Sequence, residues 1–255
     1  MKVLPMTDLD HLRVVLVATR NPLNIGAAAR AMSNFGVRRL RVVNPYDAAF
    51  REARSAVGAS GLLAKAEQYE NVAEAVADCK LVVGTTAATR RELQHRLLRL
   101  DEGARTIKRQ LKAGPVALLF GSERYGLSNQ EMSHCHWMMR IPTREEHGSM
   151  NLGQAVAVCL YELVRGKQTT PAKTRLALGK KEKASATSRE MERLTQLLFK
   201  VLRASGYINP RAAAAEEKLR RLVRRMKLNA NDAEVLLGMM RQVAWKLGAS
   251  EKDSE

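Results

Sequence analysis

Short, continuous apolar runs that alternate with alanine-rich helical patterns constrain the fold of this chain most strongly. Runs such as VVLVA and VALLF are apolar at consecutive positions, so they do not alternate with polar residues. Strands of this kind are buried on both faces, as in a sheet with helices on either side. The alternation therefore predicts an α/β fold with a parallel sheet. The expected strands are Arg13–Thr19, Arg38–Val43, Lys80–Thr85, Pro115–Phe120 and Trp137–Ile141.

Helical patterns fill the segments between these strands and follow the last one. They lie near Gly26–Phe35, Val72–Cys79, Asn129–His134 and Asn151–Val164. Ser128 and Glu131 fit a capping box at a helix start. Asn24 can cap the helix that follows it, and on the plainer interpretation Ser149 caps the last of these helices.

A change of composition after Lys167 predicts three parts. Residues 1–167 form the α/β domain, residues 168–188 form a basic linker, and residues 189–255 form a helical extension. The linker is rich in Thr, Pro, Lys, Ala and Ser and has little periodicity. The extension shows helical patterns at about Arg189–Ser205, Pro210–Met226 and Asn231–Leu247, with Asn231 or Asp232 as the cap of the third.

The net charge of +17 indicates a polyanionic partner. Nucleic acid fits better than an anionic membrane surface, and no apolar run approaches the ~18–20 residues that span a bilayer. The N-terminus does not read as a secretory signal, so we expect a cytoplasmic protein. The three cysteines are widely separated and lack CxxC spacing, which argues against a disulfide framework and against a metal site.

The segment KLRRLVRRMK in the extension has two interpretations. Its residues Leu219, Leu222, Val223 and Met226 keep helical spacing and are expected to face a core. The arginines Arg220, Arg221, Arg224 and Arg225 then occupy much of the remaining surface. Such a face is either simply solvated or contacts a polyanion, and the net charge favours an RNA contact.

Three segments carry residues suited to chemistry, and the first is ATRNPLNIGAAARAMSNFG. Gly26 permits a close backbone approach, and the small residues of Ala27–Ala31 permit tight helix packing. Arg30 then projects toward the carboxyl end of the preceding strand, where α/β proteins bind ligands. The alternative is an ordinary βα connection with a surface arginine. Because G-x-G-x-x-G is absent, a Rossmann-type methyltransferase or dehydrogenase is disfavoured.

The second segment is LLFGSERYGLS, in which Gly121 and Gly126 bracket a loop that contains Glu123. Such a loop offers backbone N–H groups to a ligand, and Glu123 is suited to accept from ligand hydroxyls or to pair with an arginine. In the third, MRIPTREEHGSMNLGQAVAVCLYEL, Ser149 and Asn151 stand at the entrance of a long apolar helix. The plainer interpretations are a glycine-rich turn and a helix cap.

Taken in order, the three segments resemble the SPOUT superfamily of knotted methyltransferases, specifically its RNA ribose 2′-O-methyltransferases. The matching residues are Asn24, Gly26 and Arg30, then Phe120, Gly121, Glu123, Gly126 and Leu127, then Ser149, Asn151, Tyr161 and Glu162. The segment VVGTTAATRREL also resembles the bacterial subfamily that methylates nucleotide 32 in the tRNA anticodon loop. Thr85 and Arg90 match its pattern, whereas Ala88 replaces a second arginine. SGYINP and EEKLRRLVRRM resemble that subfamily's C-terminal helical extension.

The resemblance implies a deep C-terminal trefoil knot whose loops bind S-adenosylmethionine. By position these loops are Thr85–Thr86, Phe120–Glu123 and Ile141–Asn151. The implied cofactor-binding residues are Thr85, Gly121, Glu123, Ile141, Ser149 and Met150. The resemblance also implies a homodimer in which Arg30 or Arg90 serves the site across the interface, and a basic extension that grips the tRNA.

For catalysis the resemblance points to Arg30. Because arginine stays charged, it is a poor base, so we expect Arg30 to bind a phosphate or to stabilise the developing 2′-alkoxide. Asn24 would orient Arg30 or the ribose, and Ser149 and Asn151 would bind the nucleotide or shape the pocket. Three rivals remain: a ribosomal RNA 2′-O-methyltransferase, a non-catalytic RNA-binding protein of the same fold, and a basic DNA-binding protein.

Overall fold

The structure, a computed structural model, describes residues 6–46, 49–50, 60–87, 93–144, 148–165, 185–208 and 213–248. Among them seven strands form one sheet in the order β3-β2-β1-β6-β4-β7-β5, and each neighbouring pair is parallel. The strands are β1 (Leu12–Val17), β2 (Arg39–Val43), β3 (Glu67–Tyr69), β4 (Leu81–Thr85), β5 (Leu97–Arg99), β6 (Val116–Phe120) and β7 (Trp137–Arg140). The predicted parallel α/β fold is confirmed.

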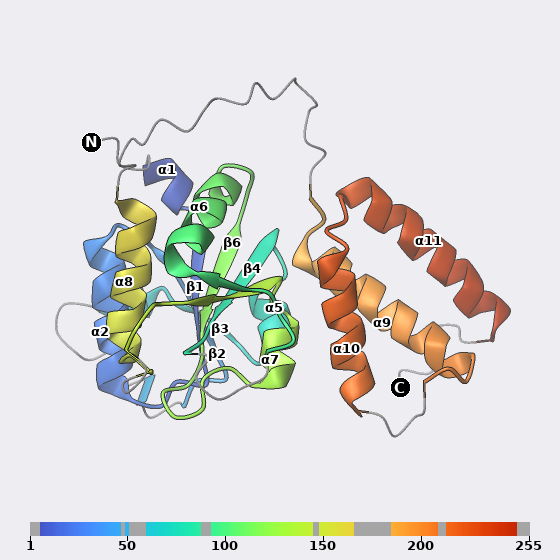
Figure 1. Ribbon diagram of the computed structural model, residues 1–255, viewed down its shortest axis with the longest axis horizontal. Helices are drawn as coiled ribbons and strands as arrows, with labels where there is room; N and C mark the ends of the chain where they lie inside the picture. The colour runs from blue at the N-terminus through green and yellow to red at the C-terminus, as the bar shows by residue number, and fades with distance from the viewer. Residues whose placement is uncertain are drawn as a thin grey trace.

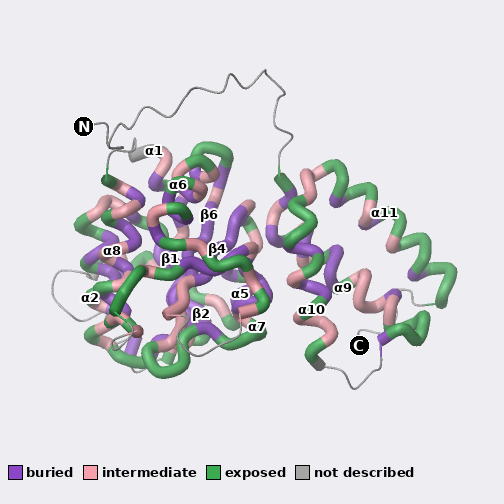
Figure 2. The backbone as a smooth tube through the Cα atoms, in the orientation of Figure 1, coloured by how far each residue is buried: buried purple, intermediate pink, exposed green. Residues whose placement is uncertain are grey.

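Helices cover both faces of the sheet (Figure 1). One face packs against α2 (Pro22–Asn34), α4 (Ser60–Ala64), α6 (Leu100–Leu111) and α8 (Leu152–Val164), and the other against α5 (Val72–Ala75) and α7 (Asn129–Ser133). A further short helix, α1 (Met6–Leu9), precedes β1. In β1, Val14 and Leu16 face the first layer while Val15 and Val17 face the second. Consecutive apolar residues of a strand therefore pack into the cores on opposite faces of the sheet. The strands form the buried centre of the sheet domain in Figure 2.

Two helices begin at caps other than those expected. Asn21, not Asn24, caps α2, because Pro22 suits the first helical position and moves the start toward the N-terminus. Asn151, not Ser149, caps α8 and accepts from two backbone N–H groups. Because Asn24 does not cap α2, its side-chain amide bonds instead to Glu123 and Asn151. The capping box of Ser128 and Glu131 is present in α7 as predicted.

Five described elements had no counterpart in the sequence prediction: the strands β3 and β5 and the helices α1, α4 and α6. The strands β3 and β5 have three residues each and lie at the two edges of the sheet, where no continuous apolar run is required. The helix α6 buries Leu100, Ala104, Ile107 and Leu111, which follow helical spacing in an otherwise charged segment.

The C-terminal helices form a unit with a core of its own. They are α9 (Ser188–Ala204), α10 (Ala213–Arg225) and α11 (Ala230–Lys246). Their core contains Ala186, Met191, Leu194, Val223, Ala233 and Leu237. Ser185 forms a bridge with Asn229, and the Ala186 N–H donates to the Leu228 carbonyl at 3.0 Å, so these residues of the expected linker belong to the unit. Asn229 caps α11, in place of Asn231 or Asp232. Residues 168–184 of the expected linker lie outside the described residues.

The helical unit packs against the α5 and α7 side of the sheet domain (Figure 1). The Ser188 N–H donates to the Cys79 carbonyl at 2.8 Å, and the Arg189 N–H donates to the Ala77 carbonyl at 3.0 Å. Arg220 donates from Nη1 to the Ser133 hydroxyl at 3.1 Å and forms an ion pair with Glu192 at 2.9 Å. Backbone and side-chain bonds therefore fix the helical unit directly to the sheet domain.

The orientation of α10 corrects the prediction for its arginines. Arg220 and Arg224 are buried, with 5% and 2% of their surface exposed, whereas Leu222 and Met226 are about half exposed. The helix contacts both α9 and α7, so its buried stripe is wider than the apolar positions alone. The expectation that Arg220 and Arg224 face RNA is wrong, because Glu192 and Glu216 neutralise the cluster inside the contact.

Arg221 and Arg225, the other two arginines expected to contact RNA, differ in their exposure to solvent. Arg221 has a side chain only 13% exposed and lies 3.6 Å from a Glu217 carboxylate oxygen. Arg225 is exposed, as are Lys218 and Lys227 on the same stretch. The exposed basic residues along the solvent face of α10 and just beyond its end are therefore Lys218, Arg225 and Lys227.

Candidate active site

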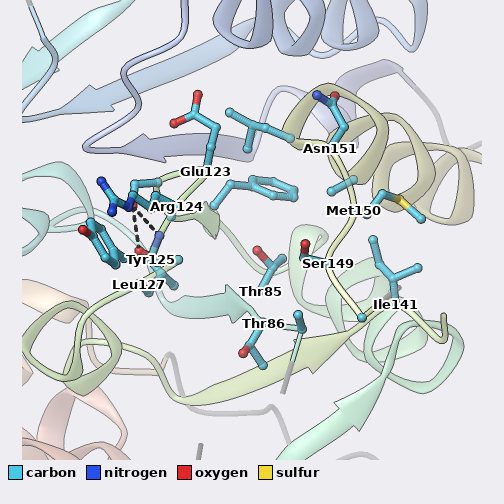
Figure 3. A pocket seen from close by; sticks show the side chains of 18 of the residues that line it. Thr85, Thr86, Glu123, Arg124, Tyr125, Leu127, Ile141, Ser149, Met150 and Asn151 are labelled. Atoms are coloured by element: carbon cyan, nitrogen blue, oxygen red, sulfur yellow. Dashed lines mark hydrogen bonds between the residues drawn. The ribbon is translucent and has the colours of Figure 1, made fainter. Parts of the chain in front are cut away.

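A cavity of about 520 Å³ opens at the carboxyl ends of β1, β4, β6 and β7 (Figure 3). Its volume lies in the range of small-molecule sites, and its place at the carboxyl edge is where open parallel sheets bind ligands. The lining residues are Asn24, Thr85–Ala87, Phe120–Leu127, Met132, Met139, Ile141, Thr143, Gly148–Leu152 and Ala155. All three segments singled out in the sequence meet here.

The loop after β6 closes tightly on itself. A Cβ added to Gly121 would overlap backbone atoms of Gly126 and Leu127, so only glycine fits. Gly126 has φ +67°, a conformation that glycine adopts without strain, and its N–H donates to the Ser122 carbonyl at 2.8 Å. The two glycines of FGSERYGL thus define the shape of one wall of the cavity.

Glu123 fastens this loop to the one that follows β1. Its carboxylate accepts from the Arg20 N–H at 3.3 Å, the Asn21 N–H at 3.2 Å and the Asn24 side-chain amide at 3.2 Å. Figure 3 shows the carboxylate directed away from Thr85 and Ser149. Partial burial raises the pKa of Glu123, but these hydrogen bonds and one from its own backbone outweigh that effect and hold the pKa below its usual value.

Asn151 joins the third loop to the other two. Its Nδ2 donates to Oδ1 of Asn24 at 2.8 Å, while its Oδ1 accepts from the Gly153 and Gln154 N–H groups at the start of α8. At Gly153 the helices α8 and α2 come so close that an added Cβ would lie 2.6 Å from the Ala27 Cβ. The small residues of α2 therefore permit the close packing that brings Asn24 and Asn151 together.

The loop after β4 contributes hydroxyl groups and backbone. Thr85 donates from its hydroxyl to the Leu119 carbonyl at 2.9 Å, and the Thr86 N–H donates to the Met139 carbonyl at 3.0 Å. Apolar side chains complete the cavity wall: Phe120, Leu127, Met132, Met139, Ile141, Leu152 and Ala155. The site thus combines an apolar surface with backbone and hydroxyl groups, which suits a ligand with both a flat ring and polar ends.

Most residues proposed from the sequence line this cavity. Thr85, Gly121, Glu123, Ile141, Ser149 and Met150 do so, as do Asn24 and Asn151. Arg30 is not among the lining residues and is exposed on α2. Arg90 lies outside the described residues. Sequence reasoning missed Arg124 and Tyr125, which lie between the two glycines of the β6 loop and whose position there was the available signal.

The described residues offer few groups for metal binding, disulfide formation or thiol chemistry. Among the residues that the structure describes, the cavity lining contains no histidine, aspartate or cysteine. The described residues contain no cluster of three or more metal-ligating His, Cys, Asp or Glu side chains. Cys79, Cys135 and Cys159 are unpaired and buried, and burial raises the pKa of each thiol, to about 12 for Cys135 and Cys159. In the described part of the chain, no helix has the length and apolar character to span a membrane.

Comparison with known proteins identifies the family. The model of the SpoU rRNA Methylase family matches residues 11–161. The chain is 35% identical over 246 residues to the tRNA (cytidine/uridine-2′-O-)-methyltransferase TrmJ of Sodalis glossinidius, with 92% of each chain covered. It is 36% identical over 238 residues to the protein of that name from Yersinia pestis, again with 92% of each covered.

Solved structures agree with this assignment. The crystal structure of TrmJ from Z. mobilis ZM4 matches with a TM-score of 0.76 and 32% identity, covering 91% of this chain and 98% of that one. The agreement extends over the sheet domain and the C-terminal helices, because so much of both chains is aligned. The chain therefore belongs to the SpoU methylase family of RNA methyltransferases.

Proposed function

We propose that this protein transfers a methyl group from S-adenosylmethionine to the ribose 2′-oxygen of tRNA, at nucleotide 32 of the anticodon loop, on cytidine, uridine or both. The observation that carries the proposal is the cavity in which Asn24, Glu123 and Asn151 join three motif loops. The relatives named as tRNA (cytidine/uridine-2′-O-)-methyltransferases support the substrate class, since they align along 92% of this chain. The segment around Thr85 supports nucleotide 32.

The residues present fit S-adenosylmethionine. The apolar wall at Leu127, Ile141 and Leu152 suits the adenine, and the backbone at Gly121 and Met150 offers polar contacts to its edge and to the ribose. When bound, the cofactor would supply an electrophilic methyl group for the 2′-oxygen, with the neutral thioether as the leaving group and the hydroxyl proton passing to solvent. We propose Thr85 and Ser149 as hydroxyl contacts and Glu123 as a positioning residue, because its carboxylate is occupied by the loop after β1.

The place of Arg30 supports a homodimer. Leu23, Ala27 and Arg30 follow one another at helical spacing on the exposed side of α2, and Leu23 is 79% exposed. The neighbouring α8 exposes Tyr161, whose ring centre lies 6.5 Å from that of Phe35 at the end of α2. We propose that a second copy covers this face, so that Arg30 of one subunit reaches the cavity of the other. The trefoil knot belongs to the same proposal, and the insertion of β7 between β4 and β5 supports it.

In that assembly Arg30 binds the phosphate beside the target ribose or the 2′-oxygen itself. A fixed positive charge there lowers the energy of the developing alkoxide without accepting its proton. Asn24 is hydrogen-bonded to Glu123 and Asn151. These bonds fix the start of α2, the helix that carries Arg30. Ser149 and Asn151 shape the side of the pocket that the nucleotide enters.

Mixing two inactive variants tests the role of Arg30 across the interface. Arg30→Ala is expected to lose methyl transfer and to keep cofactor affinity, whereas Ile141→Trp fills the cavity and is expected to lose cofactor binding. Mixed dimers contain one complete site, so partial activity returns if Arg30 acts in trans. Near-normal turnover by Arg30→Ala alone would remove Arg30 from the mechanism. Arg38→Ala, at an exposed arginine just beyond α2, is the matched control.

Ribosomal RNA is the alternative substrate, since the matching family model is named for rRNA methylation. Incubating the protein with unmodified tRNA and with unmodified ribosomal RNA, in separate reactions with labelled S-adenosylmethionine, separates the two. We expect label in the tRNA only. Label confined to ribosomal RNA would replace the proposed substrate while leaving the cofactor proposal intact.

A further inference from the structure

Two tyrosine–arginine pairs lie at the carboxyl edge of the sheet, next to the cavity. The Arg124 guanidinium carbon lies 5.1 Å from the ring centre of Tyr125, and that of Arg20 lies 6.0 Å from the ring centre of Tyr46. Tyr125 is on the β6 loop that lines the cavity, whereas Tyr46 follows β2. The strands that precede these residues, β2, β1 and β6, are neighbours in the sheet.

The two pairs are connected through Glu123. Its carboxylate accepts from the Arg20 N–H at 3.3 Å, and Arg124 is the next residue along the chain. We call Tyr46, Arg20, Glu123, Arg124 and Tyr125 the row: the backbone of Arg20 is bonded to Glu123, and Glu123, Arg124 and Tyr125 are consecutive residues that line the cavity. The loop that carries Tyr125 is held by Gly121 and Gly126, so this row rests on a fixed backbone.

Both rings are exposed in a chain that has few aromatic residues. Tyr125 is 66% exposed and Tyr46 is 57% exposed, although aromatic residues make up only 4% of the chain. Exposed tyrosines are ordinary on a protein surface, so what distinguishes these two is their place on loops at the carboxyl edge of the sheet, each with an arginine over its ring. Neither ring contributes to the hydrophobic clusters that hold the described sheet domain together.

We propose that Tyr125 with Arg124, and Tyr46 with Arg20, are two stacking platforms for unpaired bases of the RNA on either side of the target ribose. Proteins that bind single-stranded RNA stack its splayed bases on aromatic rings and on arginine planes. The arginines add positive charge for the adjacent phosphates. This inference rests on the proposed function only in taking RNA as the ligand.

The platforms explain how one ribose could be presented to the cavity. A 2′-hydroxyl in a helical stem is held by the stacked duplex, whereas a loop nucleotide can leave the stack if its neighbours find other stacking partners. Tyr125 supplies such a partner at the cavity, and Tyr46 supplies another further along the row. The row therefore selects a loop over a base-paired stem, and it does so without reading base identity.

Binding measurements with the full-length protein test this directly. The probes are a stem-loop RNA with the tRNA anticodon loop and the same stem without its loop, both at one fixed salt concentration. Tyr125→Leu and Tyr46→Leu keep apolar bulk but remove the π face, and each is expected to raise the Kd for the stem-loop by about 5- to 100-fold. Tyr125→Phe and Tyr46→Phe keep the π face and are expected to stay within about twofold of the wild type.

Removal of single bases identifies the stacked partners. If a loop base stacks on Tyr125, an abasic nucleotide at that position abolishes the further loss caused by Tyr125→Leu. Equal losses for Leu and Phe variants, or a Leu penalty that persists at every abasic position, would overturn the proposal. Unchanged RNA affinity in both Leu variants would also overturn it. So would a loss of RNA affinity that sedimentation shows to result from dissociation of the dimer.

The same experiment separates this proposal from the methyl-transfer proposal. Stem-loop binding needs no methyl transfer, so a wild-type protein that binds the loop but methylates no tRNA would contradict the function and leave the platforms standing. Conversely, a wild-type protein that methylates nucleotide 32, with Leu variants of normal affinity and normal KM for tRNA, would retain the function and remove the platforms.

Discussion

Asn151 donates a hydrogen bond from its side-chain Nδ2 to Oδ1 of Asn24, across 2.8 Å and 127 positions of sequence. Asn24 in turn donates to Glu123, so one chain of side-chain hydrogen bonds connects the loops after β1, β6 and β7. Three of the motif residues therefore hold one another. Their polar groups shape the cavity through the loops they position.

We predict that Asn151→Ala lowers both stability and cofactor affinity. The substitution removes the cap of α8, which costs about 1 kcal/mol in free energy of unfolding, and it also frees the loop that carries Ser149 and Met150. Asn71→Ala is the matched control, because Asn71 caps α5 away from the cavity. It should cost a similar stability in urea unfolding but leave the calorimetric Kd for S-adenosylmethionine unchanged. Equal cofactor affinities in the two variants would show that the bond to Asn24 is irrelevant to the site.

Gly121→Ala is predicted to distort the β6 loop. Its new methyl group would overlap the backbone of Gly126 and Leu127, which cannot rotate away, and overpacking of this kind costs about 1–3 kcal/mol or more. Cofactor binding should be lost together with stability. Gly238→Ala, in α11 where nothing lies within 4 Å of an added Cβ, should instead stabilise the protein by about 0.5–1 kcal/mol. Chemical denaturation of both variants, with calorimetry, measures the difference.

Acid should weaken the fold through His136. This residue is half-buried, and its Nδ1 accepts from the Val82 N–H at 3.1 Å. Burial of the ring, aided by the charge of Arg224, lowers the pKa of His136 to about 3. Because the unfolded histidine has a pKa near 6.5, the unfolded chain binds more protons between these values, so stability falls as pH drops from about 6.5 toward 3.

The matched variant is His136→Asn, which keeps an acceptor for Val82 but does not titrate. Between about pH 7.5 and about pH 5, the wild type should lose about 2 kcal/mol more unfolding free energy than the variant. Urea unfolding at several pH values checks this. Parallel pH profiles for the two proteins would mean that the native histidine takes up its proton as easily as the unfolded one.

The solvent face of α10 should set the salt dependence of tRNA binding. Arg225→Gln and Lys227→Gln remove exposed charges, and each is expected to reduce the slope of log K against log salt by about 1. Arg39→Gln changes an exposed arginine at the start of β2, on the opposite edge of the sheet from the cavity, and should leave the slope unaltered. If all three variants have the same slope of log K against log salt, the tRNA phosphates do not contact Arg225 or Lys227.

The layered fold followed from local patterns, because each buried strand carries its own continuous apolar run. The edge strands β3 and β5 escaped prediction because three residues at a sheet edge need no such run. The orientation of α10 escaped it for another reason: Arg220 and Arg224 enter a contact only because Glu192 and Glu216 meet them there. Charge neutralisation by distant partners cannot be read from helical spacing.

The candidate site was likewise predictable only in part. The glycines and the asparagines of the three motifs were visible as ordered segments, and they line one cavity. The bond between Asn24 and Asn151 was not predictable, since it depends on how closely α2 approaches α8 at Gly153. Tyr46 also gave no local signal, because its neighbour Arg20 comes from a different strand end.

Mapping 2′-O-methylation on an unmodified tRNA transcript tests the central claim most directly. The transcript is incubated with S-adenosylmethionine and either the wild-type protein or Arg30→Ala, and each ribose is then scored. We predict a single methylated ribose at nucleotide 32 with the wild type and none with Arg30→Ala. An unmethylated nucleotide 32 with the wild type, or equal methylation by both proteins, would contradict the account.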